Sequence, residues 1–263
     1  MASPPSSPQV VGRVGAILRG IGVHEPDGVS TTDLARHAHL ARPTAHRLLS
    51  SLAAEGLVDR DSRSGQWHLG PELYLLGASA AGRYDITQHA KDVVRALSAQ
   101  TGESAFLSAR RGDETICLLR EDGSFPLRSH VLYEGIRLPL GVASAGLVIL
   151  AHLPEREVED YLARADLVPQ WGEPHADKPL RDRIAQTRAA GYATNPALLV
   201  EGSWGMGAAV FGADGEPGWA LSLTGVESRF REERRTELGE LLLEQAHVLS
   251  QRMAATTAPR RTS

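Results

Sequence analysis

Polar side chains that could read DNA bases are concentrated between Arg42 and Arg47. The guanidinium group of Arg47, or of Arg42, can donate two parallel hydrogen bonds to guanine, and Thr44 and His46 are further candidates for base edges. A short segment rich in such groups contacts DNA only if a rigid element presents it. The helices and strands around this segment therefore determine whether its side chains can contact DNA bases.

A helix beginning at Arg42 would present these groups on one side. Pro43 suits a first helical turn, where a missing N–H costs nothing, and we expect Arg42 to be the cap. Leu48, Leu49, Leu52 and Ala53 form one apolar stripe. The polar residues lie outside that stripe, and they include Ser51, so this face is predicted to contact DNA.

A second helix and a hairpin flank the recognition helix. Ser30, Thr31 or Thr32 can cap a helix that ends near His39, and Gly56 is expected to end the recognition helix. Two short strands, 57–58 and 66–69, enclose a polar turn at 61–65. This order predicts a winged helix-turn-helix, in which the hairpin reaches the neighbouring DNA backbone. The hairpin residues expected along that backbone are Arg60, Arg63 and Trp67.

The composition is that of a globular protein large enough for two domains. The chain has 263 residues, of which 42% are hydrophobic and 23% are charged. Its formal net charge is −4, and residues 1–70 hold seven arginines against six acidic residues, so placement of charge supports DNA binding more than its sum does. No apolar run resembles a signal peptide or a membrane helix, so we expect a cytoplasmic protein without a membrane partner.

The predicted organisation has five parts. Residues 1–9 form a disordered arm, 10–70 the winged helix-turn-helix domain with a first helix at 10–23, and 71–84 a linker helix. Residues 85–254 form an α+β domain with an antiparallel sheet, and 255–263 a disordered tail. Strands are expected at 104–110, 115–120, 127–133, 207–211 and 219–224. Helices are expected from 85 or 87 to 101 and at 143–152, 155–165, 178–190 and 232–253.

No catalytic or metal-binding set emerges. Ser144 and Ser203 lack the glycine two residues before them that a nucleophile elbow requires. His37 and His39 would point to different faces of a helix, and Cys117 alternates with apolar neighbours like a core residue. We therefore expect neither an enzyme nor a metal site. A small-molecule-converting enzyme with a helical accessory domain remains the alternative of another class.

The segment ARPTAHRLLSSLAAEGLVDRDSRSGQWHLGPELYLLG resembles the N-terminal domain of IclR-type bacterial transcriptional regulators. The resemblance extends from residue 10 to about 253 through TGESAFLSARRGDETICLLR, RLPLGVASAG, AAGYATN and EGSWGMGAAVFGADGEPGWALSLTG. It implies a GAF-like effector-binding domain after the linker helix. It also implies a homodimer or dimer of dimers that binds double-stranded operator DNA, responds to a small-molecule effector and needs no cofactor.

The resemblance also places an effector pocket in the second domain. Its expected lining is Leu132, Ser144, Ala145, Asn195, Trp204, Gly205, Met206, Ser222 and Thr224. Compared with relatives, RLPLGVASAG lacks a histidine, a hydroxyl group and a lysine, a cysteine is replaced by Gly205, and a carboxylate is missing near Asn195. Because these losses remove charged groups, we expect a bulky, weakly charged effector. The alternative is a vestigial pocket, with control by oligomerisation or a protein partner.

Overall fold

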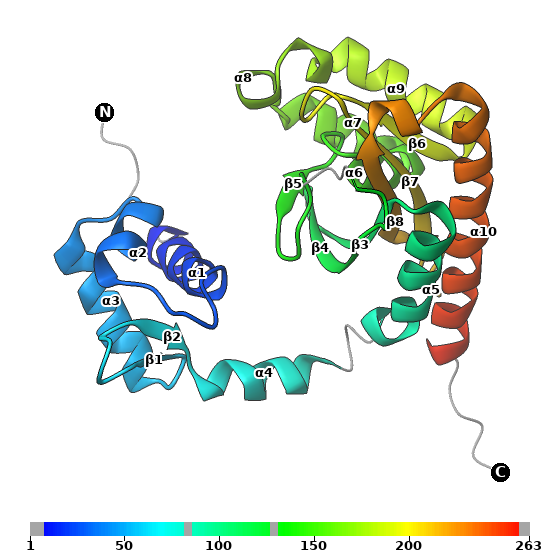
Figure 1. The fold of residues 1–263 in the computed structure, drawn as a ribbon. Coiled ribbons are helices and arrows are strands. Elements are labelled where there is room, and N and C mark those ends of the chain that lie inside the picture. Colours follow the sequence, from blue (N-terminus) through cyan, green and yellow to red (C-terminus); the bar gives the residue numbers. More distant parts are fainter. Residues whose placement is uncertain (1–7, 82–85, 127–130, 258–263) are drawn as a thin grey trace, which may run out of the picture. The chain divides into compact units, whose positions relative to one another are not determined.

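The computed structural model describes residues 8–81, 86–126 and 131–257 of the chain. The chain divides into two compact units, Met1–Tyr84 and Asp85–Ser263 (Figure 1). Among the helices within the described ranges, none is long and apolar enough to cross a membrane.

The first unit is built on three helices, α1 (Pro8–Gly22), α2 (Thr31–His37) and α3 (Arg42–Ala54). Ser30 caps α2, and its hydroxyl oxygen accepts a hydrogen bond of 3.1 Å from the backbone N–H of Asp33. The cap of α3 is Ala41, so the prediction that Arg42 is the cap was wrong by one residue. Arg42 is instead the first helical residue, and Pro43 lies in the first turn.

A two-stranded hairpin follows α3. Gly56 takes the left-handed conformation (φ 69°) that ends a helix, and the strands β1 (Val58–Arg60) and β2 (Trp67–Leu69) pair antiparallel. Helix α4 (Pro71–Ala81) comes next. Helices and hairpin share one core, formed by Ile17, Ile21, Val29, Leu34, Leu49, Leu52, Val58 and Trp67.

The second unit contains a six-stranded antiparallel sheet in the order β5-β4-β3-β8-β7-β6. The strands are β3 (Ser104–Arg111), β4 (Glu114–Glu121), β5 (Arg137–Pro139), β6 (Tyr192–Pro196), β7 (Ser203–Phe211) and β8 (Pro217–Val226).

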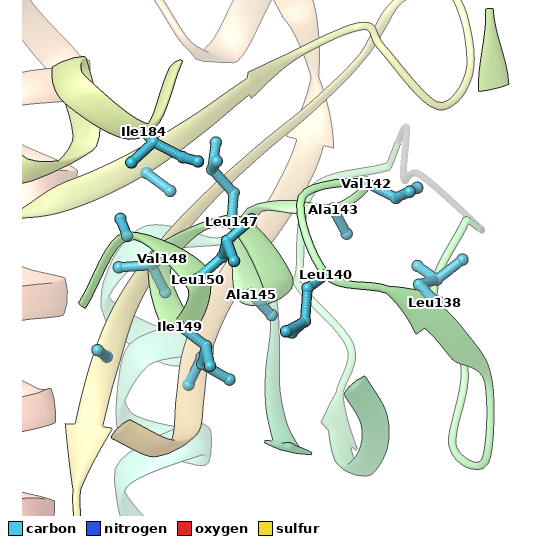
Figure 2. Close-up of a cluster of buried hydrophobic side chains, with 14 of the residues drawn as sticks. Leu138, Leu140, Val142, Ala143, Ala145, Leu147, Val148, Ile149, Leu150 and Ile184 are labelled. Carbon is cyan, nitrogen blue, oxygen red and sulfur yellow. The ribbon is translucent and has the colours of Figure 1, made fainter. Parts of the chain in front are cut away.

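Helices cover both faces of this sheet. One apolar cluster joins the sheet to α5 (Ile86–Thr101) and α10 (Glu232–Thr257). The other joins it to α6 (Ser144–His152), α7 (Glu155–Arg164) and α9 (Asp177–Ala190). We call the first the α5/α10 cluster and the second the α6 cluster. Three short helices, α8 (Val168–Trp171), η1 (Glu173–His175) and η2 (Glu227–Arg229), complete the unit. Residues 144–151 of α6 are all buried, and Figure 2 shows their apolar side chains packed within this second cluster.

The two central strands divide their residues between these faces. Along β7, Met206, Ala208 and Val210 belong to the α5/α10 cluster, whereas Ala209 belongs to the α6 cluster. The same alternation holds in β8, where Leu221 and Leu223 face α5 and α10 and Ala220 faces α6. Each strand therefore contributes to two separate cores.

A buried carboxylate ties the start of β3 to the start of α10. Glu103 is 2% exposed, and its Oε1 accepts hydrogen bonds of 2.7 Å from Nε of Arg229 and from Nη1 of Arg234. The backbone oxygen of Thr101 accepts from Nη2 of both arginines. Two cations thus offset the cost of burying one anion.

Several expected element bounds differ from the structure. The predicted strand at 127–133 was wrong for 131–133, which lie outside any strand, and 127–130 lie outside the described residues; β5 pairs with β4 instead. Strand β6 was missed. The predicted arm was too long, because α1 begins at Pro8, and residues 1–7 are not described. Helix α10 continues to Thr257, beyond the predicted start of the tail, and 258–263 are not described.

Candidate DNA-binding surface and effector cavity

One face of helix α3 is buried in the core of the first unit, and the opposite face is exposed to solvent. Ala45, Leu49 and Leu52 are buried, and their spacing places them on one side of the helix. Because Leu49 and Leu52 insert into the core shared with α1, α2 and the hairpin, the orientation of the opposite face is set by packing.

The open face carries most of the groups predicted to read bases. Arg42, His46, Arg47 and Ser51 are exposed, and Thr44 is half-buried at the edge. We call the four exposed residues the α3 surface. Nε of Arg47 lies 3.4 Å from the backbone oxygen of Pro43, and the hydroxyl group of Ser51 donates to the backbone oxygen of Arg47. The structure shows no hydrogen bond or ion pair from the side chains of Arg42 and His46 to any described residue.

The turn of the hairpin is ordered by one carboxylate. Oδ1 of Asp61 accepts from the backbone N–H groups of Arg63 (2.9 Å) and Ser64 (2.6 Å) and from the Ser64 hydroxyl group (2.9 Å). Hydrogen bonds from the backbone and hydroxyl group of Ser64 hold the pKa of Asp61 below its usual range. Nε of Arg60 donates to the backbone oxygen of Gly65 across the hairpin. This frame leaves the side chain of Arg63 exposed at the tip.

Trp67 is part of the core rather than of the surface. It is 3% exposed, and its indole Nε1 donates a 2.9 Å hydrogen bond to the hydroxyl group of Thr31 at the start of α2. The guanidinium carbon of Arg60 lies 5.6 Å from the centre of its ring. The prediction that Trp67 lies along the DNA backbone is therefore wrong, because its side chain holds the hairpin against α2.

A second brace of the hairpin was not predicted. Glu25, in the loop after α1, accepts a 2.7 Å hydrogen bond from the backbone N–H of Leu69 and lies 3.1 Å from Nδ1 of His68. The Leu69 N–H and then His68 lower the pKa of Glu25 below its ordinary value of 4.5. Glu25 and Leu69 are far apart in sequence, and no local pattern indicates their contact.

The second unit contains a small cavity where six predicted effector residues meet. These are Leu132, Ser144, Asn195, Trp204, Gly205 and Thr224. The rest of the lining, which sequence reasoning missed, is Val131, Ala143, Leu199 and Ser203. Each of the four is adjacent in sequence to a predicted residue except Leu199, which no sequence pattern indicated. The volume is about 10 Å³, which is room for about one water molecule.

Three predicted effector residues do not line this cavity. Met206 is fully buried on the opposite face of the sheet, among side chains of the α5/α10 cluster, so its prediction as a cavity wall was wrong. Ala145 and Ser222 are buried but do not line the cavity. Met206 lies on the other side of the sheet because successive residues of β7 alternate between its faces, so Gly205 and Met206 point in opposite directions.

The polar side chains that line the cavity differ in whether they have hydrogen-bond partners. Nδ2 of Asn195 donates a 2.6 Å hydrogen bond to the backbone oxygen of Val142, and its Oδ1 accepts from the N–H of Leu198 at 3.3 Å. Oγ1 of Thr224 is buried and, among the described residues, has no hydrogen-bond partner. The lining contains no charged side chain. The cavity therefore offers hydroxyl chemistry in apolar surroundings, without a cation to neutralise an anionic ligand.

The described residues contain no cluster of three or more histidine, cysteine or acidic side chains that could hold a metal. Burial raises the pKa of the Cys117 thiol to about 12, which keeps it protonated and unreactive.

Comparison with protein families assigns both units. The model of the IclR helix-turn-helix domain matches residues 10–62, and that of the bacterial transcriptional regulator IclR C-terminal domain matches residues 78–251. The chain belongs to the IclR family of bacterial transcriptional regulators. It is therefore a DNA-binding regulator with an N-terminal helix-turn-helix domain and a C-terminal effector-binding domain.

Individual relatives cover nearly the whole chain. The regulator BhcR of Paracoccus denitrificans is 29% identical over 233 residues, which cover 86% of this chain and 81% of the relative. The transcriptional repressor IclR of Escherichia coli is 28% identical over 246 residues, covering 89% and 88%. These relatives are regulators rather than enzymes, in agreement with the expectation from sequence.

Solved structures share the fold. The IclR protein of Thermotoga maritima superposes with a TM-score of 0.70 at 25% identity, covering 93% of this chain and 98% of that one. An IclR homologue from Microbacterium hydrocarbonoxydans, solved in complex with 4-hydroxybenzoate, has a TM-score of 0.75 at 23% identity and covers 93% and 99%. The expected fold class, a helix-turn-helix domain followed by an α+β domain with an antiparallel sheet, is confirmed.

Proposed function

We propose that this regulator reads its operator with the α3 surface. Arg47, or Arg42, donates to guanine, and Thr44 and His46 contact neighbouring bases. The observation that carries this proposal is that Arg42, His46 and Arg47 are exposed, with Thr44 half-buried at their edge, on a helix whose other face is buried in the core. Arg63 contacts phosphate from the hairpin tip. Arg60 lies beside it and also braces the hairpin, and Ser51 lies at the far end of the α3 surface.

A mobility-shift experiment tests this assignment directly. The full-length protein is titrated onto DNA from upstream of its own gene, with random duplex as competitor and at two salt concentrations. We expect a shift that survives the competitor at moderate salt and weakens as salt rises, because released counterions contribute to binding. Equal affinity for both duplexes would contradict sequence reading by this surface.

We further propose that two copies act together, as a homodimer or a dimer of dimers. Large apolar side chains are exposed in the DNA-binding unit at Val10 and Val11 of α1 and at Tyr74, Leu75 and Leu76 of α4. Such groups favour contact with another apolar surface, and a second copy places two recognition helices about 34 Å apart, one turn of DNA. Sedimentation of Leu75→Asp, compared with Arg63→Ala, tests this. A wild-type dimer that Leu75→Asp leaves intact would contradict the contribution of α4.

The cavity is proposed as the effector site, and the protein is proposed to act in the cytoplasm. Unpartnered Thr224 and the uncharged lining favour a weakly charged effector carrying a group that bonds a hydroxyl. The resemblance to relatives is the ground for proposing that this effector is larger than small keto acids. The 4-hydroxybenzoate held by the Microbacterium homologue supports the idea that this fold accepts aromatic molecules. Calorimetry with small carboxylates and larger neutral metabolites tests the preference, and tighter binding of the carboxylates would contradict it.

The size of the cavity favours a second candidate. At about 10 Å³ it is far below the roughly 300–1,000 Å³ of typical ligand sites. A regulator with a vestigial pocket would respond to oligomerisation or to a protein partner instead. The two candidates separate in one measurement, because only the first predicts that a small molecule changes operator affinity in the purified protein.

A further inference from the structure

A segment between two strands forms one wall of the cavity. Leu199 lines it from the stretch 197–202, which joins β6 to β7, whereas Ser144, Gly205 and Thr224 belong to a helix and two paired strands. The side chain of Leu199 is half-buried and packs against the α6 cluster. Leu132 and Leu199 each combine a large apolar side chain with a position outside the sheet ladder, and of these two Leu199 is the half-buried one, next to the residue bonded by Asn195.

Asn195 holds this segment in place from both ends of its amide. A carbonyl oxygen can only accept, so the bond to the backbone oxygen of Val142 fixes the NH₂ group on that side. The amide oxygen is then directed to the N–H of Leu198, the residue before Leu199. Asn195 is 3% exposed, so these bonds form away from water. The amide thus connects Val142, just before α6, to the segment that carries Leu199.

The backbone of the segment has a change of direction at each end. Ala197 has a φ of 56° and Gly202 a φ of 74°, both in the left-handed region. That region is rarely adopted by residues with a Cβ, so Ala197 keeps it only while its surroundings hold it there. Between the two positions, Val200 is 53% exposed, so the segment carries one side chain towards the cavity and another towards solvent.

We infer that Leu199 is the residue that sets the size of molecule the cavity admits, with Asn195 as the positioning residue that keeps it there. The ligand class is a neutral ring with one hydroxyl group, larger than a small keto acid, which replaces the Leu199 side chain and bonds to Thr224. This inference rests on the proposed function of the cavity as the effector site. It adds the specificity residue and the way in which a closed cavity gains volume.

The test uses the full-length protein and phenol as the probe. Truncating a side chain in an apolar site can leave a dry cavity, and such cavities of about 150 Å³ bind benzene. Calorimetry should show that Leu199→Ala binds phenol at least about tenfold more tightly than the wild type, which corresponds to about 1.4 kcal/mol. The matched control is Val200→Ala, which removes an exposed neighbour from the same segment and should leave phenol binding at the wild-type level.

A second pair of variants keeps the test decisive if Leu199→Ala folds poorly. Leu199→Val removes less volume and should give a smaller gain, whereas Leu199→Phe should give none. Equal phenol affinity in Leu199→Ala, Val200→Ala and the wild type would overturn the inference. So would a gain in Leu199→Phe that matches the gain in Leu199→Ala, because both results separate phenol binding from the volume at position 199.

The role of Asn195 has its own readout. Asn195→Asp keeps the acceptor for Leu198 but places a carboxylate oxygen against the backbone oxygen of Val142, where no donor remains. Hydrogen exchange at the amides of Leu198 and Ser203 should become several-fold faster, while exchange in β3 stays unchanged. Unaltered exchange at Leu198 would overturn the positioning role.

Failure of the proposed function gives a different result from failure of this inference. If phenol binds Leu199→Ala tightly and leaves its operator affinity unchanged, Leu199 controls the volume as inferred but the cavity does not regulate DNA binding. If phenol lowers operator affinity equally in the wild type and Leu199→Ala, the cavity regulates DNA binding but Leu199 does not control access.

Discussion

The α3 surface and the effector cavity present their functional groups in opposite ways. On α3 the side chains of Arg42 and His46 extend from a fixed helix into solvent, so a ligand can meet them without any rearrangement. In the cavity, Asn195 is already bonded to main-chain groups, and the space that Leu199 and the other lining residues leave is about 10 Å³. A rigid surface suits a partner with a constant shape such as duplex DNA, whereas a closed cavity couples binding to a change in the protein.

The largest effect should come from removing the support of the DNA-binding surface. Trp67→Ala deletes a buried ring and leaves the hydroxyl group of Thr31 without its donor, so we expect a loss of about 3–5 kcal/mol in the free energy of unfolding of that unit. Thermal unfolding followed by circular dichroism measures it. Arg63→Ala, on the exposed tip of the same hairpin, is the control and should unfold like the wild type. Equal stability of both variants would remove Trp67 from the core.

Arg47→Ala should affect DNA binding without affecting folding. If Arg47 donates to guanine, its loss costs about 1–3 kcal/mol, roughly ten- to hundredfold in affinity, at one base pair of the operator. Binding to operators mutated at each position measures the loss and its location. Because Arg42 is the other candidate, Arg42→Ala serves as the paired variant. A loss that is uniform over all sequences for both would show phosphate contacts rather than base reading.

Arg63→Ala should weaken binding to all sequences alike. A phosphate contact contributes through counterion release, so the slope of log affinity against log salt should fall by about 0.9. Fluorescence anisotropy over a salt series, with operator and random duplex side by side, measures both slopes. An unchanged slope would place Arg63 away from the backbone.

Thr224→Val should stabilise the second unit while removing the hydroxyl group that the proposed effector contacts. Because Oγ1 of Thr224 is buried without a partner, replacing its hydroxyl group by a methyl group of similar shape should stabilise the effector unit by about 1 kcal/mol. The same change should abolish binding of hydroxyl-bearing ligands. Denaturant unfolding and calorimetry measure the two effects, and destabilisation by Thr224→Val would show that the hydroxyl group is satisfied in solution.

The smallest expected effect concerns pH and the hairpin brace. The folded state lowers the pKa of Glu25 below 4.5, so its contribution to stability is complete above the unfolded pKa and is lost as pH falls through the folded pKa. Glu25→Gln should cost under about 1 kcal/mol at pH 7, and the difference from the wild type should shrink below about pH 4. Urea unfolding at several pH values measures it, and a constant difference would exclude the carboxylate as the cause.

Local signals in the sequence account for most of the DNA-binding unit. The cap at Ser30, the proline in the first turn of α3 and the left-handed Gly56 each act within a few residues, and they place helices and hairpin correctly. The error at Trp67 has a different origin. A strand of three residues does not reveal which of its faces meets the core, and the partner of Trp67 is Thr31, at the start of α2.

In the second unit, which holds the effector cavity, local sequence signals do not predict which side chains line the cavity. The resemblance to relatives brought Ser144, Asn195, Gly205 and Thr224 together, although they lie on four different elements, α6, β6, β7 and β8. The phase of β7 was not available, because the strand was expected to start at Gly207 and actually starts at Ser203. Met206 was therefore assigned to the wrong face. The volume of the cavity depends on how lining residues from distant segments pack, and such packing leaves no local trace in the sequence.

The division of the central strands between two cores has a practical consequence for anyone wishing to build a biosensor on this scaffold. From Gly205 to Val210 the odd-numbered positions of β7, together with the even-numbered positions of β8, adjoin α6, while their neighbours support α5 and α10. Mutant libraries confined to the first set can alter which compound is detected, while the layer that holds the long C-terminal helix stays intact. The scaffold can thus acquire new responses one strand face at a time.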